Sequence, residues 1–454
     1  MSFPTYPAYK DSGVKWLSDV PEHWDVRRNK QVFRLVSVQV GNKSADFQLL
    51  SLTLRGVIPR DMESGKGKFP AEFDTYQVVE PDDIVFCLFD IDETPRTVGI
   101  SSDFGMITGA YTVAKTRPAA DPRFIYYYYF SIDLRKGLRP FYTGLRKVVR
   151  PETFLNIELP LPPLSEQANI CNFLDHETAR IDALIEEQQR LIELLKEKRQ
   201  AVISHAVTKG LDPTVPMKDS GVEWLGEVPA HWKVSKLGHY AQILTGFPFP
   251  SASFSHDESD VRLLRGANIG VGSLKWIDTV YWELNEGDVL SSYLMTEGQI
   301  VLGMDRPWIS EGMRIARVTQ DDMPCLLLQR VAAITPNAGL NDEYLYCLLA
   351  SELFKAYVEP DLTGVSVPHI SPEQILSFQI PIPPIDEQRM IGGFIKDQLD
   401  QMSALFQQAS ENVKLLQERR AALISAAVTG KIDVRGWQPP ASTQARESAV
   451  AEAV

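Results

Sequence analysis

Several side chains in short stretches that contain Gly or Pro have the chemistry needed to contact phosphates and base edges. Arg can bind guanine through two parallel hydrogen bonds, Lys pairs with phosphate, and Asn can bind adenine through two bonds. The candidates in the first half of the chain are Arg55, Arg60, Lys66, Lys68, Tyr142, Arg146 and Lys147. Those in the second half are Arg262, Arg265, Asn268, Arg306, Ser366 and His369. These residue types favour nucleic-acid binding, and a solvated surface side chain is the alternative interpretation of each.

The motifs that would do chemistry on nucleic acid are absent from the sequence. The three Pro-Pro pairs read LPPL, IPPI and QPPA, so no [DNS]-P-P-[FYW] loop is present to hold a flipped adenine. No GxxxxGK[ST] phosphate loop occurs, and no Glu is followed two residues later by Lys, as in a common nuclease site. Histidines are dispersed, and the cysteines form no CxxC pair, so we expect no metal site and four buried, reduced thiols. The sequence therefore predicts a chain without catalytic activity.

An internal repeat decides the expected architecture. KDSGVKWLSDVPEHWDV at residues 10–26 recurs as KDSGVEWLGEVPAHWKV at residues 218–234. LPLPPLSEQANICNFLD (159–175) matches IPIPPIDEQRMIGGFIK (380–396), and EKRQAVISHAVTKGLD (197–212) matches ERRAALISAAVTGKID (418–433). Each copy thus holds a segment ending in His-Trp, a divergent stretch, a Pro-Pro-x-x-Glu-Gln junction and a helical segment.

Each helical segment is predicted to be one long helix. The Pro-Pro pairs prevent an earlier start, Ser165 and Asp386 are the expected N-caps, and Gly210 and Gly430 are the expected ends. Apolar residues step by threes, fours and sevens, as in a coiled-coil seam. They are Ile170, Leu174, Ile181, Leu184, Leu191, Leu195 and Val202, and then Ile391, Ile395, Met402, Leu405, Leu416 and Leu423. Antiparallel packing of two rods about 65 Å long would hold two similar globular domains apart about a pseudo-two-fold axis.

Two further segments are interpreted as structural. The His-Trp pairs, His23-Trp24 and His231-Trp232, are expected to dock against the long helices rather than to touch DNA. The run IYYYYF at residues 125–130 could stack on bases, but residues 344–349 echo it at helical spacing, so we predict a core helix.

The charge balance limits how such a protein could hold DNA. The net charge is −13; residues 1–160 carry 21 basic and 20 acidic side chains, whereas residues 217–380 carry 11 and 21. Because phosphate contacts come from Lys and Arg, we expect weak DNA affinity without a partner protein that supplies positive surface.

The junctions PLPPLSEQ and PIPPIDEQ, both helix ends and the SGVxWL…VPxHW segments resemble type I restriction-modification DNA-specificity subunits, over essentially the whole chain and in both copies. The resemblance implies a mixed α/β (α+β) fold with five segments. They are a first target-recognition domain (1–160), a first helical spacer (161–216), a second target-recognition domain (217–380), a second helical spacer (381–436) and a disordered tail (437–454).

The resemblance also implies the partners and the role. Each recognition domain would read one half of a bipartite, asymmetric site on double-stranded DNA. Two modification subunits carrying S-adenosylmethionine for adenine N6 methylation, and restriction subunits using ATP and Mg, would do the chemistry. No cofactor is expected in this chain.

Three alternatives stay open at this stage. They are a stand-alone DNA-binding regulator, a specificity subunit of a methyltransferase that has no restriction subunit, and a coiled-coil scaffold that does not bind DNA. The N-terminus lacks a secretory pattern and no apolar run is long enough for a membrane span, so a cytoplasmic location is expected. The bases read and the spacer length do not follow from the sequence.

Overall fold

The computed structural model describes residues 3–14, 16–60, 73–285, 287, 289–310, 312–362 and 368–439. The chain divides into two compact units: unit 1 comprises Met1–Gln189 and Glu411–Val454, and unit 2 comprises Arg190–Ser410. Each unit therefore combines one globular part with portions of both long helices. Among the described residues, no helix combines the length and the apolar character of a membrane span.

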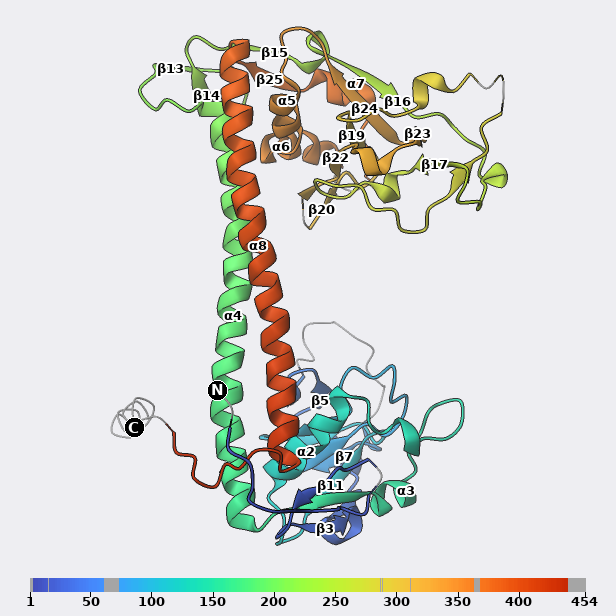
Figure 1. The fold of residues 1–454 in the computed structure, drawn as a ribbon, viewed down its shortest axis with the longest axis vertical. Helices are drawn as coiled ribbons and strands as arrows, with labels where there is room; N and C mark the ends of the chain where they lie inside the picture. The colour runs from blue at the N-terminus through green and yellow to red at the C-terminus, as the bar shows by residue number, and fades with distance from the viewer. Residues whose placement is uncertain are drawn as a thin grey trace. The chain divides into compact units, whose positions relative to one another are not determined.

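Unit 1 is built around a four-stranded antiparallel sheet (Figure 1). Its order is β4 (Phe33–Val36), β11 (Thr112–Thr116), β8 (Ile84–Phe86) and β9 (Val98–Ile100). Four strand pairs accompany it: β1 (Tyr9–Lys10) with β2 (Val20–Pro21), β3 (Asp25–Arg28) with β12 (Glu158–Leu161), β5 (Leu50–Thr53) with β6 (Gly56–Pro59), and β7 (Gln77–Val79) with β10 (Gly105–Ile107). The short helices are α1 (Asn29–Val32), α2 (Pro122–Leu134) and α3 (Pro151–Asn156).

Unit 2 repeats this frame with a sheet of the same order. It runs β16 (Ala241–Thr245), β24 (Val331–Pro336), β19 (Ile300–Gly303) and β22 (Ile315–Arg317), again antiparallel. Its other strands are β13 (Met217–Asp219) with β14 (Glu227–Pro229), β15 (Lys233–Lys236) with β25 (Gln379–Ile382), β18 (Tyr281–Trp282) with β17 (Val261–Leu264) and β23 (Cys325–Leu327), and β20 (Trp308–Ile309) with β21 (Gly312–Met313). The short helices are α5 (Asp342–Leu349), α6 (Glu352–Leu362) and α7 (Pro372–Ser377).

The central strands and one helix form the core of each unit. β8 and β19 are buried along their whole length, as expected of apolar strands covered on both faces. α2 contains the IYYYYF run, and nearly all of that run is buried, so the predicted core helix is confirmed. α2 begins where Asp121 caps it by accepting from the Arg123 N–H at 2.8 Å, and Asn341 caps α5 in the same way. The four cysteines are buried and unpaired, as predicted.

The two long helices are α4 (Leu164–Lys209) and α8 (Ile385–Val428). The expected N-caps are wrong: the Pro163 carbonyl accepts from the Glu166 and Gln167 N–H groups, both at 2.9 Å, so Ser165 lies inside the first turn. The same holds for Asp386 in α8. The predicted ends are confirmed, since Gly210 and Gly430 follow the helices with φ of 73°.

Within each unit the portions of α4 and α8 pack antiparallel. In unit 1, Arg420 Nε lies 2.8 Å from Asp182 Oδ1, and Asn412 donates to Gln188 at 3.4 Å, so rising numbers in α4 meet falling numbers in α8. In unit 2, Lys196 lies over the Phe406 ring.

The predicted apolar seam holds only in part. Ile170, Leu174, Ile181, Leu195, Ile391, Ile395, Met402 and Leu423 are buried, as predicted. Leu184, Leu191 and Leu405 are exposed instead, and Ile203 rather than Val202 is buried. The 3.6-residue turn of a straight helix drifts relative to a 3.5-residue repeat, which moves predicted seam positions away from the partner helix.

The repeated junction ties each long helix to its globular part. Glu166 of α4 accepts from Trp24 Nε1 at 2.9 Å and lies 2.8 Å from His23 Nε2. The next residue, Gln167, accepts from the Asp121 N–H at the start of α2 at 2.7 Å. Trp24 is fully buried, so the predicted docking of the His-Trp pair against a long helix is confirmed.

Unit 2 repeats these contacts. Glu387 accepts from Trp232 Nε1 at 3.0 Å and lies 2.8 Å from His231 Nε2. Gln388 accepts from the Asn341 N–H at the start of α5 at 2.8 Å.

The segment after α8 is ordered where the sequence predicted a disordered tail to begin. Asp433 N–H donates to the Pro4 carbonyl at 2.7 Å, and the Trp437 ring packs on Phe173 and His176 with centroids 5.5 and 5.4 Å apart. Residues 440–454 of that predicted tail lie outside the described residues.

Candidate nucleic-acid interface

Both units hold a strained residue in the turn that follows the buried central strand. Asp90 follows β8 with φ of 46°, and Arg306 follows β19 with φ of 44°. Their N–H groups donate to the carbonyls of Arg146 and Pro368, at 2.9 and 2.7 Å, in the loops that precede α3 and α7. Left-handed backbone at a residue other than Gly costs of order 1–3 kcal/mol and concentrates at functional sites. The turn and the loop it holds therefore form the candidate interface in each unit.

Ion pairs hold this region together in unit 1. Asp92 Oδ1 accepts from Arg139 Nε at 2.7 Å, and Asp92 Oδ2 lies 3.0 Å from Lys147 Nζ, which also donates to Glu93 at 2.5 Å. The hydrogen bonds from Arg139 and Lys147 lower the pKa of Asp92 to about 2. Tyr142 completes the cluster by donating to Asp92 at 3.3 Å.

The predicted contact residues of unit 1 therefore fall into two groups. Lys147 and Tyr142 fasten the loop to the turn through Asp92, so each already has a partner. Arg146 and Arg55 are exposed, Arg146 in the loop before α3 and Arg55 in the turn between β5 and β6. Arg60 is half-buried just after β6, and Lys66 and Lys68 lie outside the described residues.

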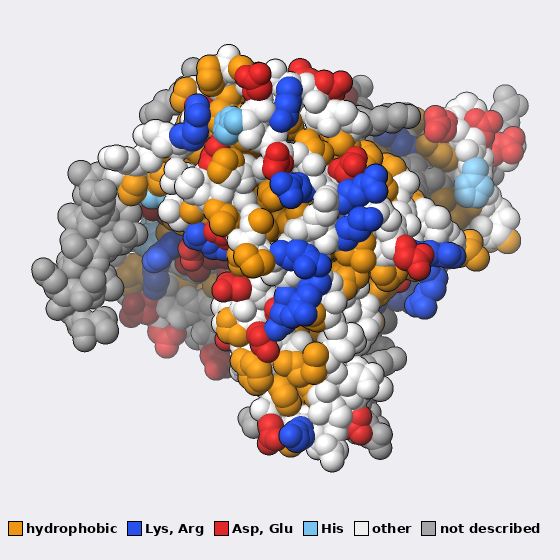
Figure 2. All heavy atoms as spheres, turned by 90° about the horizontal axis from the view of Figure 1, so that it is seen from below, with side chains coloured by type: hydrophobic (Ala, Val, Ile, Leu, Met, Phe, Trp, Pro, Cys, Tyr) orange, Lys and Arg blue, Asp and Glu red, His pale blue; other side chains and the backbone are white. Residues whose placement is uncertain are grey.

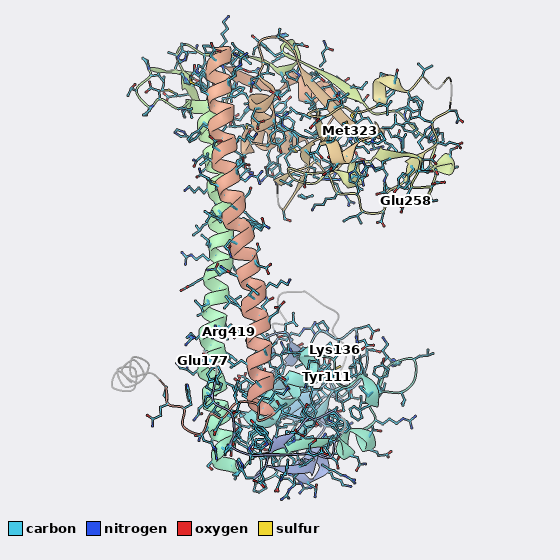
Figure 3. The ribbon with its side chains drawn as sticks, viewed as in Figure 1. Tyr111, Lys136, Glu177, Glu258, Met323 and Arg419 are labelled. Carbon is cyan, nitrogen blue, oxygen red and sulfur yellow. The ribbon has the colours of Figure 1, made fainter. Side chains whose placement is uncertain are left out.

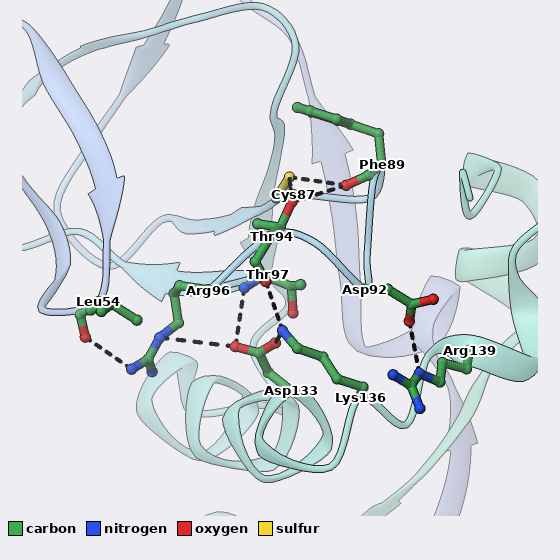
Figure 4. Close-up of polar contacts among 10 residues, drawn as sticks. All are labelled: Leu54, Cys87, Phe89, Asp92, Thr94, Arg96, Thr97, Asp133, Lys136 and Arg139. Carbon is green, nitrogen blue, oxygen red and sulfur yellow. Dashed lines mark hydrogen bonds and ion pairs between the residues drawn. The ribbon is translucent and has the colours of Figure 1, made fainter. Parts of the chain in front are cut away.

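Residues 87–97 connect the exposed arginines to the core of unit 1 (Figure 4). Arg96 donates to the Leu54 carbonyl at 2.9 Å, next to Arg55, and its guanidinium lies 4.1 Å from the Phe130 ring centroid of α2. Lys136, which follows α2 (Figure 3), donates to the Thr94 carbonyl at 2.7 Å and to Asp133 at 2.9 Å. The 87–97 segment is thus held in place by residues at the end of α2.

The corresponding place in unit 2 is a hollow of about 420 Å³ lined by arginines. Its lining comprises Phe254, Arg265, Gly266, Ala267, Asp305, Arg306, Arg314, Leu328, Gln329 and Arg330. Four of the eleven basic residues of the acidic segment 217–380 thus gather at one place beside a single carboxylate. The hollow can bind a phosphate or the acceptor edge of a base.

The hydrogen bonds around the hollow leave donors available. Asp305 pairs with Arg330 at 3.0 Å and with His369 Nδ1 at 2.7 Å. Arg314 donates to the carbonyls of Ile269 and Asp305 at 3.0 and 3.1 Å. Arg306 is exposed. Arg265 donates to the Asp278 carbonyl through a terminal nitrogen, while its Nε is buried without a hydrogen-bond partner among the described residues.

Two predicted contacts in unit 2 already have partners within the protein. Asn268 is fully buried; its amide accepts from the Arg265 N–H and donates to the Lys275 carbonyl, both at 3.0 Å, so it cannot bind adenine without breaking both bonds. Arg262 donates to the carbonyls of Asp321 and Met323 and stacks on Trp276. Ser366 lies outside the described residues, and His369 reaches the rim through Asp305.

Sequence reasoning missed Arg314, Arg330 and Arg139. Arg314 lies within the apolar stretch GMRIA and Arg330 next to a buried strand, where a basic side chain gives no local signal of surface chemistry. The available signal is positional and covers one residue: the matching pairings of β8 and β19 place Arg306 where unit 1 has Asp90.

The acidic net charge is unevenly distributed. Figure 2 shows Lys and Arg side chains gathered in a run over one face of the molecule. Attraction of phosphate depends on such local charge rather than on the total, so a chain of net charge −13 can still present a DNA-binding face.

Comparison with known proteins gives a family match over more than half of the chain. The profile of the type I restriction modification DNA specificity domain matches residues 103–195 and 229–415. The MjaVIII type I restriction enzyme specificity subunit of Methanocaldococcus jannaschii is 30% identical over 316 residues, which is 68% of this chain and 70% of that protein.

Two further similarities are narrower or more distant. The EcoAI specificity subunit of Escherichia coli is 31% identical over 207 residues, 45% of this chain but only 34% of that subunit. One chain of a solved structure from work on complex assembly and conformational transition of the type I R-M system superposes on this chain with a TM-score of 0.65, at 17% sequence identity. That match covers 90% of this chain and 98% of the other.

Proposed function

Because this chain belongs to the type I restriction modification DNA specificity family, whose role is DNA recognition without catalysis, we propose that its two units read the two halves of a bipartite, asymmetric site. The observation that carries the proposal is the repeated frame with unlike loops. Both units mount a strained turn and its partner loop on the same sheet, but one presents acidic residues at the turn and the other an arginine-lined hollow. Two readers that differ in chemistry should bind two different sequences.

The exposed arginines are the proposed DNA contacts. In unit 1 these are Arg55 and Arg146, and in unit 2 the exposed arginine is Arg306; half-buried Arg265, which lines the hollow, and His369, which reaches its rim through Asp305, are further candidates. Arg can bind guanine O6 and N7 together or pair with phosphate, so substitution should weaken binding and relax one half of the site. We do not retain Asn268, Arg262, Tyr142 or Lys147 as contacts, because their polar groups are already engaged.

Apolar side chains exposed on the long helices support binding to partner proteins. In α4 they include Leu184, Leu191 and Leu194, and in α8 Leu405, Phe406 and Leu415. These side chains are not needed for packing between the two helices, and their exposure on both helices supports a protein partner. We propose that two modification subunits bind there and that the helices set the distance between the half-sites.

The chemistry then resides on those partners. S-adenosylmethionine would be bound by the modification subunits for adenine N6 methylation, and ATP and Mg by restriction subunits. This chain's part is to place the DNA against them, through its own side chains.

Methylome sequencing tests the proposal. DNA from cells that express this chain with its neighbouring methyltransferase is compared with DNA from cells lacking the chain. We expect a split methylated motif that disappears with the chain. Arg306→Ala should relax or abolish recognition in one half of that motif, and Arg55→Ala in the other half. Methylation that is unchanged without the chain, while the methyltransferase is expressed and active, would instead favour a stand-alone regulator or a scaffold.

A further inference from the structure

Two hairpin tips of unit 1 each carry an exposed leucine followed by an exposed arginine. They are Leu54-Arg55, between β5 and β6, and Leu145-Arg146, in the loop before α3. Leu54 is 66% exposed and Leu145 is 102% exposed, and no other large apolar side chain among the described residues of unit 1 is exposed as much. Neither leucine belongs to the hydrophobic core of unit 1.

The Leu145 tip is held in one conformation. Thr143 and Val148 exchange both backbone hydrogen bonds, at 3.0 and 3.2 Å, and Lys147 closes the turn by donating from its N–H to the Gly144 carbonyl at 3.1 Å. Lys147 has a strained φ of 45°, and its side chain is fastened to Asp92 and Glu93. The turn thus has a strained backbone at Lys147, although the side chain that it exposes, Leu145, makes no packing contribution to unit 1.

The Leu54 tip is also held by hydrogen bonds, in part from the same segment of the chain. The Thr53 hydroxyl donates to the Gly56 carbonyl and accepts from the Arg55 N–H, both at 3.1 Å. The Leu54 carbonyl accepts from Arg96 at 2.9 Å, and Arg96 belongs to the 87–97 segment that also holds Arg146 through the Asp90 N–H. One braced segment therefore fastens both tips, as Figure 4 shows for its contacts with Leu54, Asp133 and Arg139.

The pairing of leucine with arginine indicates the ligand. Arginine side chains bind phosphates, and apolar side chains such as leucine are used by DNA-bending proteins as wedges that enter a groove and partly unstack a base step. Resting on the proposed DNA-reading function, we propose that the two tips form a two-pronged DNA grip. Arg55 and Arg146 hold phosphates, Leu145 inserts at a base step of the half-site read by unit 1, and Leu54 packs against the same groove.

The test uses the full chain assembled with its modification subunits and a duplex carrying the site found by methylome sequencing. 2-Aminopurine is placed at each position of the half-site in turn, because its fluorescence rises when a base is unstacked. We expect a rise at one step with the wild-type chain and its loss with Leu145→Ala. The same substitution should weaken specific binding about tenfold without changing the dependence of log K on log salt, whereas Leu145→Met should retain both properties.

Two control variants separate the roles of the side chains. Arg146→Ala should keep the fluorescence rise but lower the salt slope by about 0.9, the value for one lost phosphate contact. Leu134→Ala provides the matched leucine: Leu134 is 45% exposed and is followed by Arg135, but it lies at the end of α2, and Arg135 folds back onto the Ser131 carbonyl. This variant should behave as wild type in both measurements.

Three outcomes distinguish failure of the wedge from failure of the function. Tight, specific binding with no fluorescence rise at any position of the half-site would overturn the wedge and leave DNA reading intact. Loss of modification subunits from the purified Leu145→Ala complex, with normal DNA binding once assembled, would assign the tip to a protein contact instead. A wild-type complex that binds no sequence preferentially would contradict the proposed function itself.

Discussion

Units 1 and 2 share a sheet order, an anchoring junction and a strained turn, yet they differ in what they place at that turn. Unit 1 has Asp90 and Asp92 there, with Asp92 paired to Arg139 and Lys147, and it presents the exposed Arg55 and Arg146 on tips. Unit 2 has Arg306 at the matching place and gathers arginines in a hollow. Because the shared parts are buried and the differing parts are loops, recognition chemistry can change between copies without disturbing the packing.

The two junctions are a second point of comparison, since they use the same contacts with different burial. Glu166 is buried and also accepts from Tyr6, whereas Glu387 is 24% exposed and Thr214 stands where Tyr6 would lie. Burial and the Glu166 carboxylate both raise the pKa of Tyr6. We therefore expect the stability of unit 1 to depend more on Glu166 than the stability of unit 2 depends on Glu387.

The largest expected effect is the loss of stability when Glu166 is replaced. Glu166→Ala would leave Trp24 Nε1 and the Tyr6 hydroxyl buried without an acceptor, so we expect a loss of about 3 kcal/mol in the stability of unit 1. Glu387→Ala should cost unit 2 about 1–2 kcal/mol, because water reaches that site more easily. The stability of each unit can be compared by hydrogen exchange and mass spectrometry at increasing denaturant concentrations. Peptides covering residues 20–28 report on unit 1, and peptides covering residues 228–236 report on unit 2. Equal losses would refute the asymmetry.

The hollow of unit 2 supplies the next prediction. Arg306→Ala should weaken specific DNA binding by about 10- to 100-fold and relax one half-site, because it removes an exposed donor. Asn268→Ala is the contrasting variant: it should destabilise unit 2 by about 1–3 kcal/mol and should relax sequence preference less than Arg306→Ala does, since its amide holds the Arg265 backbone and not DNA. Binding measured on matched and single-mismatch duplexes, with thermal unfolding, separates the two. Specificity relaxed as far in the Asn268 variant as in the Arg306 variant would indicate that the Asn268 side chain contacts DNA.

A smaller effect is expected at the segment after α8. Trp437→Ala should destabilise unit 1 by about 1–2 kcal/mol, because the ring packs on Phe173 and His176. Unit 2 should be unaffected, because Trp437, Phe173 and His176 all belong to unit 1. Exchange of peptides covering residues 3–10 and 170–177 would report the change. Faster exchange in unit 2 as well would contradict this local role.

The smallest effect concerns pH. The folded-state pKa of Asp92 lies near 2, below its ordinary value of 3.8, so its stabilising effect is complete above about pH 4 and is lost as the pH falls through about 2. We therefore expect protection of the Val148 amide, corrected for intrinsic exchange, to be the same at pH 5 and pH 8. Asp92→Asn should reduce it several-fold at both. A marked loss of protection in the wild-type chain between pH 8 and pH 5 would mean that another group fastens the tip.

Sequence by itself determined the features that depend on local pattern and on repetition. The duplicated junction gave two long helices ending at Gly210 and Gly430, the IYYYYF run gave a core helix, and the motifs gave the family. These succeed because helix periodicity, glycine's access to positive φ and a repeated motif are all properties of neighbouring residues.

Only the tertiary structure decided which polar side chains remain available to a ligand. Asn268 and Arg146 look equally suited to DNA in the sequence, yet one is buried with its amide occupied and the other stands exposed on a tip. Arg314 and Arg330 join the hollow from segments that gave no local signal. The physical reason is that burial and pairing depend on residues brought together from distant parts of the chain, as Lys147 is with Asp92.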